Sequence, residues 1–285
     1  NKKINLWKHK IVSPDAAGQQ MIYQYGASLP GLAKGIMSLN FVKRKISFIA
    51  EGAKTIKYDF PNILIETKPF ETDIPLGFWR AVYDSQNSFA NECFIDELAY
   101  QGEIDPVELR LKHLDSNSRS VAVIKKAAKE SSWRTKLKEG RFHGFAYHHS
   151  FGSHVAEVAE ISVSKSNKVR VHNVTCVVDC GQTVNPMTIR AQMQSAIVFG
   201  IGATLKSEIT VNKGKVDQSN YDNYKVLRMD EMPRIDVHII KNNEYPGGVG
   251  EPGLPPIAPA ITNAVYAATG KRIRKLPIRP SDLRS

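Results

Sequence analysis

The chain has 285 residues, an ordinary globular composition and a net charge of +11 at pH 7. This length is enough for one large domain or two of ordinary size, and no apolar run approaches the roughly 18 residues of a membrane-spanning helix. The basic residues are scattered without interleaved aromatic side chains, which favours a lysine-coated surface, although a nucleic-acid-binding module remains an alternative. No basic stretch followed by an apolar core opens the chain, and no compartment is predicted.

Strands and loops are expected in the first 70 residues, followed by helices. Short apolar runs predict strands at 45–49 and 62–66, and a helix is expected around 29–39. The clearest helical pattern runs from about residue 85 to residue 100 and ends before Gly102. Its apolar positions recur at helical spacing: Phe89, Ala90, Cys93, Phe94, Leu98 and Ala99.

Two more helices are expected before residue 131. Asp105-Pro106 has the form of an N-cap followed by a proline in the first turn, and the apolar spacing continues to Leu114. The stretch 121–130 is the third predicted helix. A polar connector follows it, and we place the boundary between two lobes there, giving residues 1–135 and 136–285.

The second half alternates hairpins with helices. Strands are predicted at 155–163 and 169–178, with burial on both faces towards the end of the second strand. A helix from Asn185-Pro186 to about residue 205 contains Gly200 and Gly202, which indicates close packing against its backbone. Further strands at 208–211 and 234–240 precede a last helix at 259–269. The whole pattern predicts an α+β fold with mixed sheets and packed helices.

The cysteines and histidines carry little functional signal. Cys176 and Cys180 are four residues apart on a predicted strand, a span of roughly 13 Å that is too long for a disulfide or for shared zinc ligation. The group His148, His149 and His154 matches no zinc-site spacing. No protein metal ligand is therefore predicted.

One acidic residue lies inside a stretch of small residues. The segment 246–253 holds Glu251 among glycines and prolines, and an alanine-rich helix follows. Glycines allow a backbone to approach a ligand closely, so this pattern indicates a single carboxylate presented in a crowded place. A solvated glutamate on a glycine-rich surface hairpin is the alternative.

Two other segments combine residue types that suit a polar ligand. Gly77-Phe78-Trp79-Arg80 precedes a helix, where backbone N–H groups and a guanidinium can both face an anion. The alternative is a strand end with a buried tryptophan. Gln192 and Gln194 lie on an otherwise apolar helix and could hydrogen-bond a buried ligand or simply face solvent.

Taken together, these segments resemble the molybdopterin-binding large subunit of the xanthine dehydrogenase superfamily. The branch most similar to them is the isoquinoline 1-oxidoreductase β subunit, together with its aldehyde-oxidising relatives. The resemblance rests on three motifs in the same order: Gly77-Phe78-Trp79-Arg80 with the helix through Glu92 to Leu98, Asp179-Cys180-Gly181 with Asn185-Pro186 and Gln192, and Gly248-Val249-Gly250-Glu251-Pro252-Gly253. It covers nearly the whole chain but only the C-terminal part of the family subunit. Gln194-Ser195-Ala196 departs from the glycine-richer turn of many relatives.

The resemblance implies a role for each matching residue. Glu251 would be the catalytic base that takes a proton from a molybdenum-bound hydroxyl. Gly77, Phe78, Trp79 and Arg80 would line the molybdenum and pterin edge, with Gly250 beside them. Gln192 would hydrogen-bond the pterin or its phosphate. In this family the molybdenum is held by the pterin dithiolene and not by side chains, so the resemblance implies no protein metal ligand.

The resemblance also implies the reaction, the cofactor and the partners. The reaction would be oxidative hydroxylation of an N-heterocycle or an aldehyde with water-derived oxygen. The cofactor would be the cytosine dinucleotide form, and the partners would be the upstream half of the same subunit, a [2Fe–2S] subunit and a further acceptor such as a cytochrome. The chain alone is expected to bind no cofactor and to be inactive. A non-catalytic remnant of the same fold, used for assembly, is the alternative.

Overall fold

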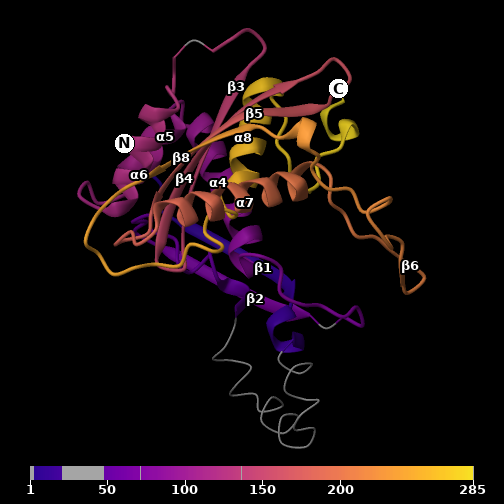
Figure 1. Ribbon diagram of the computed structural model, residues 1–285. Coiled ribbons are helices and arrows are strands. Elements are labelled where there is room, and N and C mark those ends of the chain that lie inside the picture. The colour runs from indigo at the N-terminus through magenta and orange to yellow at the C-terminus, as the bar shows by residue number, and fades with distance from the viewer. Residues whose placement is uncertain (1–2, 21–47, 71, 136, 285) are drawn as a thin grey trace, which may run out of the picture.

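The computed structural model describes residues 3–20, 48–70, 72–135 and 137–284 (Figure 1). Runs of strands are followed by single helices along the second half of the chain, which agrees with an α+β fold. The helices are α4 (Val82–Gln101), α5 (Pro106–Lys112), α6 (Arg119–Glu130), α7 (Pro186–Leu205) and α8 (Ile257–Thr269). The strands are β1 (Trp7–Pro14), β2 (Ile63–Phe70), β3 (Phe142–Ser150), β4 (Ser153–Val163), β5 (Val169–Asp179), β6 (Val211–Asn212), β7 (Lys215–Val216) and β8 (Arg234–Ile239).

A four-stranded sheet in the order β3-β4-β5-β8 forms the centre of the molecule. The first three strands pair antiparallel and β8 joins β5 in parallel, so the sheet is mixed. The chain reaches β8 only after α7 and the small β6–β7 hairpin, which projects from the body in Figure 1. Strands β1 and β2 form a separate parallel pair.

Both faces of the central sheet are covered by helices. On one face the apolar side of α7 and α8 packs against alternate residues of β3, β4 and β5. On the other face α4, α5 and α6 pack against the intervening residues, together with Trp7, Tyr58 and Phe60 from the first part of the chain. Burial on both faces explains why Val174 to Val178 forms a nearly continuous apolar run.

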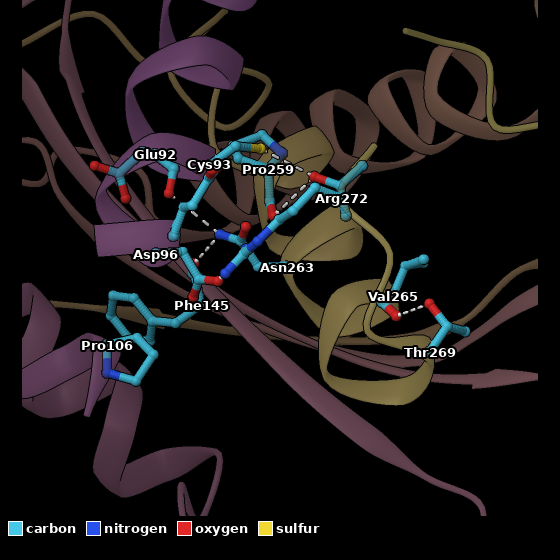
Figure 2. A network of polar contacts seen from close by, with 12 residues as sticks. Glu92, Cys93, Asp96, Pro106, Phe145, Pro259, Asn263, Val265, Thr269 and Arg272 are labelled. Atoms are coloured by element: carbon cyan, nitrogen blue, oxygen red, sulfur yellow. Dashed lines mark hydrogen bonds and ion pairs between the residues drawn. The ribbon is translucent and has the colours of Figure 1, made fainter. Parts of the chain in front are cut away.

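A polar network joins α4 to α8 (Figure 2). The amide of Asn263 on α8 donates to the backbone carbonyls of Glu92 and Phe145. Arg272, just past the end of α8, pairs with Asp96 on α4 at 2.6 Å. These contacts fix two helices that come from positions about 170 residues apart in the chain.

Most predicted elements are confirmed, and the errors have physical causes. The predicted strand at 48–49 is wrong, because Phe48–Ala50 forms a turn of 3-10 helix; residues 45–47 and the predicted helix at 29–39 lie outside the described residues. The strand expected at 208–211 is reduced to a two-residue pairing. In both cases a short apolar run carried no information about whether a pairing strand lies beside it.

The buried face of α4 differs from the expected apolar stripe. Phe94 is 45% exposed, whereas several polar side chains of the helix are buried. The buried polar residues of α4 are Asp84, Asn87, Ser88, Asn91, Glu92 and Asp96. Apolar periodicity therefore located the helix correctly but assigned part of its inward face wrongly.

Other expectations concern the cysteines, the histidines and the membrane. Cys93, Cys176 and Cys180 are free and buried, as predicted. In the part of the chain that the structure describes, no three His, Cys, Asp or Glu side chains form a metal-holding group. Within the same residues, none of the helices combines the length and the apolar character needed to cross a membrane. The division into residues 1–135 and 136–285 stays a prediction.

Candidate active site

Arg80 brings the three sequence motifs together at one place. Its guanidinium donates to the backbone carbonyl of Gly250, with Nε at 2.8 Å and a second, very short contact from Nη2. The same side chain donates to Ser195 Oγ at 3.1 Å and to Gln192 Oε1 at 3.0 Å on α7. A planar, charged fork with several N–H donors can make these contacts simultaneously.

The carboxylate of Glu251 lies at the N-terminus of α4. Its Oε1 atom accepts a hydrogen bond of 2.8 Å from the backbone N–H of Ala81, the residue that precedes the helix. Among the described residues this is the one hydrogen bond that the Glu251 carboxylate receives. The positive end of the helix dipole favours an anion at this place. The second carboxylate oxygen stays available for another group.

The backbone around Ala81 has an unusual conformation. Ala81 has a φ of 66° and Val82 a φ of 43°, both in the left-handed region that non-glycine residues rarely adopt. The side chain of Ala81 is fully buried against Ala196 and Leu254. Strained residues of this kind persist where the surrounding structure holds them, and they concentrate at functional sites.

The loop that carries Glu251 is fixed by the end of the β3–β4 hairpin. Gly248 N–H donates to the carbonyl of Phe151 at 2.7 Å, and Ser153 Oγ donates to the carbonyl of Gly248 at 2.6 Å. At Gly247 a side chain would begin 2.5 Å from Ser153 Oγ, so only glycine fits this close approach. The crowded presentation predicted for Glu251 thus has a definite cause in the structure.

Gln19 and Gln20 fix the segment before Arg80. Phe78 N–H donates to Gln20 Oε1 at 2.5 Å, and Leu76 N–H donates to Gln19 Oε1 at 3.0 Å. Sequence reasoning missed both glutamines, because no local pattern marks them. Gly77, Phe78 and Trp79 lie near the surface, so the alternative of a strand end with a buried tryptophan does not describe this segment.

An open depression of about 540 Å³ lies beside Arg80. Trp79 stacks on Phe199 of α7 at its edge, with ring centroids 4.9 Å apart, and both rings remain about two-fifths exposed. The residues that line the depression are Arg80, Gln194, Ser195, Val198, Phe199 and Met232. A guanidinium, amide and hydroxyl groups therefore adjoin a flat apolar surface.

The negative charge of Glu251 affects the pKa values of two nearby groups, Arg80 and Glu51. Partial burial lowers the pKa of Arg80, and the negative charge of Glu251 opposes that effect. Burial raises the pKa of Glu51, and the charges of Asp84 and Glu251 raise it further. Glu51, Asp84 and Glu251 thus form an acidic neighbourhood that the sequence analysis did not predict.

Comparison with known proteins identifies the class of domain. A family model described as a molybdopterin cofactor-binding domain matches residues 94–233. The beta subunit of isoquinoline 1-oxidoreductase from Brevundimonas diminuta is 34% identical over 230 residues, which are 79% of this chain and 29% of that protein. A nicotinate dehydrogenase subunit from Pseudomonas putida is 33% identical over 247 residues, or 80% of this chain and 21% of that one.

Solved structures with low sequence identity share the fold. Quinoline 2-oxidoreductase from Pseudomonas putida 86 superposes with a TM-score of 0.73 at 13% identity, covering 82% of this chain and 56% of that one. Aldehyde oxidoreductase from Desulfovibrio gigas gives a TM-score of 0.69 at 15% identity, covering 98% and 46%.

The fold and the sequence matches define part of a molybdopterin-cofactor-binding domain. The chain belongs to the xanthine dehydrogenase superfamily, within its molybdopterin-binding large subunits. It spans between a fifth and three-tenths of the length of the curated relatives named above.

Proposed function

We propose that the chain supplies the catalytic base and part of the cofactor cradle of a molybdenum hydroxylase that oxidises an N-heterocycle or an aldehyde. The observation that carries this proposal is the convergence of all three motifs on Arg80, which ties Gly250 and Gln192 together beside Glu251. Motifs separated by about 110 and 170 residues have no structural need to meet at one exposed place.

The chemistry of the converging groups fits a molybdenum–pterin cofactor. Gln192 accepts from Arg80 through Oε1, which leaves its amide N–H groups to donate to a pterin or a phosphate. The stacked rings of Trp79 and Phe199 offer a flat surface beside these polar groups. Gly250 keeps open space around its Cα, because a side chain there would meet nothing within 4 Å. We therefore assign Gly77 to Arg80, Gln192 and Gly250 to the cofactor's edge.

When bound, the cofactor supplies the oxygen nucleophile and accepts the two electrons of the oxidation. Glu251 acts as the general base, because the Ala81 amide holds one of its carboxylate oxygens and the other is free to accept a proton. Arg80 orients Glu251 indirectly, since it fixes the carbonyl of the preceding residue. Hydrogen-bonded positioning of this kind is a large contribution to general-base catalysis.

The finer assignments follow the same proposal. We assign the cytosine dinucleotide form of the cofactor, the upstream half of the same subunit as the other wall of the site, and electron exit through a [2Fe–2S] subunit to an acceptor such as a cytochrome. On this proposal the isolated chain binds no cofactor and is inactive. Stoichiometric molybdenum in the isolated chain would contradict that expectation.

The test is metal and nucleotide analysis of the native full-length complex alongside a complex carrying Glu251→Gln. We expect bound molybdenum and cytosine nucleotide in both, with turnover lowered about 10²- to 10⁴-fold in the variant. Glu244→Gln, an exposed glutamate seven residues earlier, is the matched control and should keep wild-type turnover.

Two outcomes would contradict the proposal. Native complex without molybdenum would leave a retained fold with an assembly role, and the search would turn to its protein partners. Wild-type turnover in Glu251→Gln, with molybdenum present, would place the base elsewhere.

A further inference from the structure

A buried histidine–aspartate pair lies outside the residues that the proposed function uses. His148 Nε2 on β3 is 2.7 Å from Asp84 Oδ1 on α4, and both side chains are less than 10% exposed. The pair therefore joins strand β3 to the first turn of helix α4. Neither residue touches the depression beside Arg80.

Asp84 belongs to the turn that presents the Ala81 amide to Glu251. The backbone N–H of Asp84 donates to the carbonyl of Ala81 at 2.9 Å, which closes the turn around the strained residues Ala81 and Val82. Gly52 packs against the other side of Asp84: a side chain at that glycine would begin 3.0 Å from both the Cα and the carboxylate of Asp84. Movement of Asp84 would therefore move the Ala81 amide.

His148 belongs to the hairpin that carries the Glu251 loop. It lies on β3, three residues before Phe151, whose carbonyl accepts the hydrogen bond of Gly248 N–H. The pair thus links the two supports of Glu251, one that binds its carboxylate and one that holds its backbone. The negative charges of Asp84 and Glu251 both act on Glu51, so the pair lies beside the acidic neighbourhood of Glu251.

We propose that His148 and Asp84 are a positioning pair: they hold the N-terminus of α4 in register with the Glu251 loop, so that the Ala81 amide binds one carboxylate oxygen of Glu251. This inference rests on the proposed role of Glu251 as the base. Neither residue of the pair contacts a reacting group. Asp84 acts through the backbone of Ala81, and His148 acts through the hairpin that binds Gly248.

The experiment uses the full-length complex with His148→Leu, His148→Gln and the control His172→Gln. Glutamine places an amide nitrogen near the position of Nε2 and should keep the hydrogen bond to Asp84, whereas leucine removes it. His172 is hydrogen-bonded to Ser162 at 2.8 Å elsewhere on the sheet, which makes it a matched histidine without a link to Glu251. Glu251→Ala serves as the reference for complete loss of the Ala81 hydrogen bond.

Three quantities are measured: molybdenum content, kcat with KM, and deuterium uptake at the Ala81 amide. We expect His148→Leu to lower kcat about 10- to 100-fold with KM within about twofold and molybdenum content unchanged, because a displaced base loses alignment with its target. Ala81 exchange should accelerate about as much as in Glu251→Ala. His148→Gln should recover most of both effects, and His172→Gln should match the wild type.

Unchanged Ala81 exchange in His148→Leu, or a fall in kcat that glutamine does not recover, would overturn the inference. If leucine prevents folding, His148→Asn replaces it, since the shorter amide cannot reach Asp84. Exchange at Ala81 needs no cofactor, so the pairing can be decided even if the native complex lacks molybdenum and the proposed function fails.

Discussion

Glu92 with Arg110 and Glu251 with Arg80 are two glutamate–arginine centres of the same molecule, but their carboxylates are used differently. Both oxygens of Glu92 are occupied: Oε1 accepts from Tyr58, and Oε2 accepts from Arg110 and from the backbone of Tyr147. Glu92 and Arg110 are almost completely buried.

At the second centre the arginine and the carboxylate bind different partners. Arg80 donates to a backbone carbonyl and to α7, whereas Glu251 receives a single amide hydrogen bond from the described residues and is partly exposed. A carboxylate with all its acceptor positions filled stabilises a fold, and one with a free oxygen at the surface can accept a proton. The pairing pattern therefore distinguishes the two roles, whereas the residue types do not.

A glutamine substitution at Glu92 and at Glu251 should separate the structural role of the first from the catalytic role of the second. Glu92→Gln removes the counter-charge that is hydrogen-bonded to the buried Arg110, and we expect the free energy of unfolding to fall by about 3–5 kcal/mol. Glu251→Gln should change it by less than about 0.5 kcal/mol. Urea unfolding of the two variants beside the wild type measures both. Equal losses would mean that Glu251 also has a structural role.

Substitution of Arg80 tests whether its contacts position Glu251. Arg80→Lys keeps a positive charge but cannot contact Gly250, Ser195 and Gln192 together. We expect turnover of the full complex to fall about 10- to 100-fold, with unfolding changed by less than about 1 kcal/mol. Arg274→Lys, an exposed arginine paired with Glu97, is the control. Full turnover in Arg80→Lys would show that the fork geometry is dispensable.

The sequence could predict the elements and the motifs at this centre, but it could not predict how they are held. Gly-rich spacing identified Glu251, and Arg80 followed from its place before a helix. Gln19 and Gln20 act through contacts made across the fold, and no local pattern marks them. His148 was noted only within a histidine group that matches no zinc-site spacing, and its partner Asp84 is distant in the chain. The buried polar face of α4 was missed for the same reason, because its partners come from distant segments.

Glu157 is a third glutamate, and it extends the comparison to a buried carboxyl without a partner. It is fully buried on β4, with Cys176 as its cross-strand neighbour, and among the described residues neither carboxyl oxygen has a hydrogen-bond partner of normal geometry. Burial raises the pKa of Glu157 well above its ordinary value. The folded chain therefore retains a proton that the unfolded chain releases as pH rises above about 4.5, so this group destabilises the fold at neutral pH.

Replacement of Glu157 should consequently stabilise the protein. We expect Glu157→Met to raise the free energy of unfolding at pH 7 by about 1–3 kcal/mol, since an apolar side chain of similar size needs no partner. The gain should shrink at pH 4, where the unfolded chain holds the proton as well. Urea unfolding at both pH values checks this, and a loss of stability at pH 7 would indicate a partner that the carboxyl requires.

The smallest expected effect concerns two histidines on the β3–β4 hairpin, of which His154 is buried and His149 is partly buried. Burial lowers the pKa of His149 to about 4 and that of His154 to about 3, and nearby positive charges act in the same direction. Unfolded histidine titrates near 6.5, so the unfolded chain binds protons between pH 6.5 and about 4 that the folded chain excludes. The histidines' contribution to stability is therefore complete above pH 6.5 and is lost as pH falls.

His154→Gln isolates one part of that pH dependence. Its imidazole Nδ1 contacts Tyr147 Oη at 2.8 Å and Ser120 Oγ at 3.2 Å, and glutamine can hydrogen-bond in this region without taking up a proton. Between pH 7 and pH 4 the variant should lose on the order of 1–2 kcal/mol less stability than the wild type. Parallel stability curves for the two proteins would mean that His154 takes up its proton in the folded state as readily as in the unfolded chain.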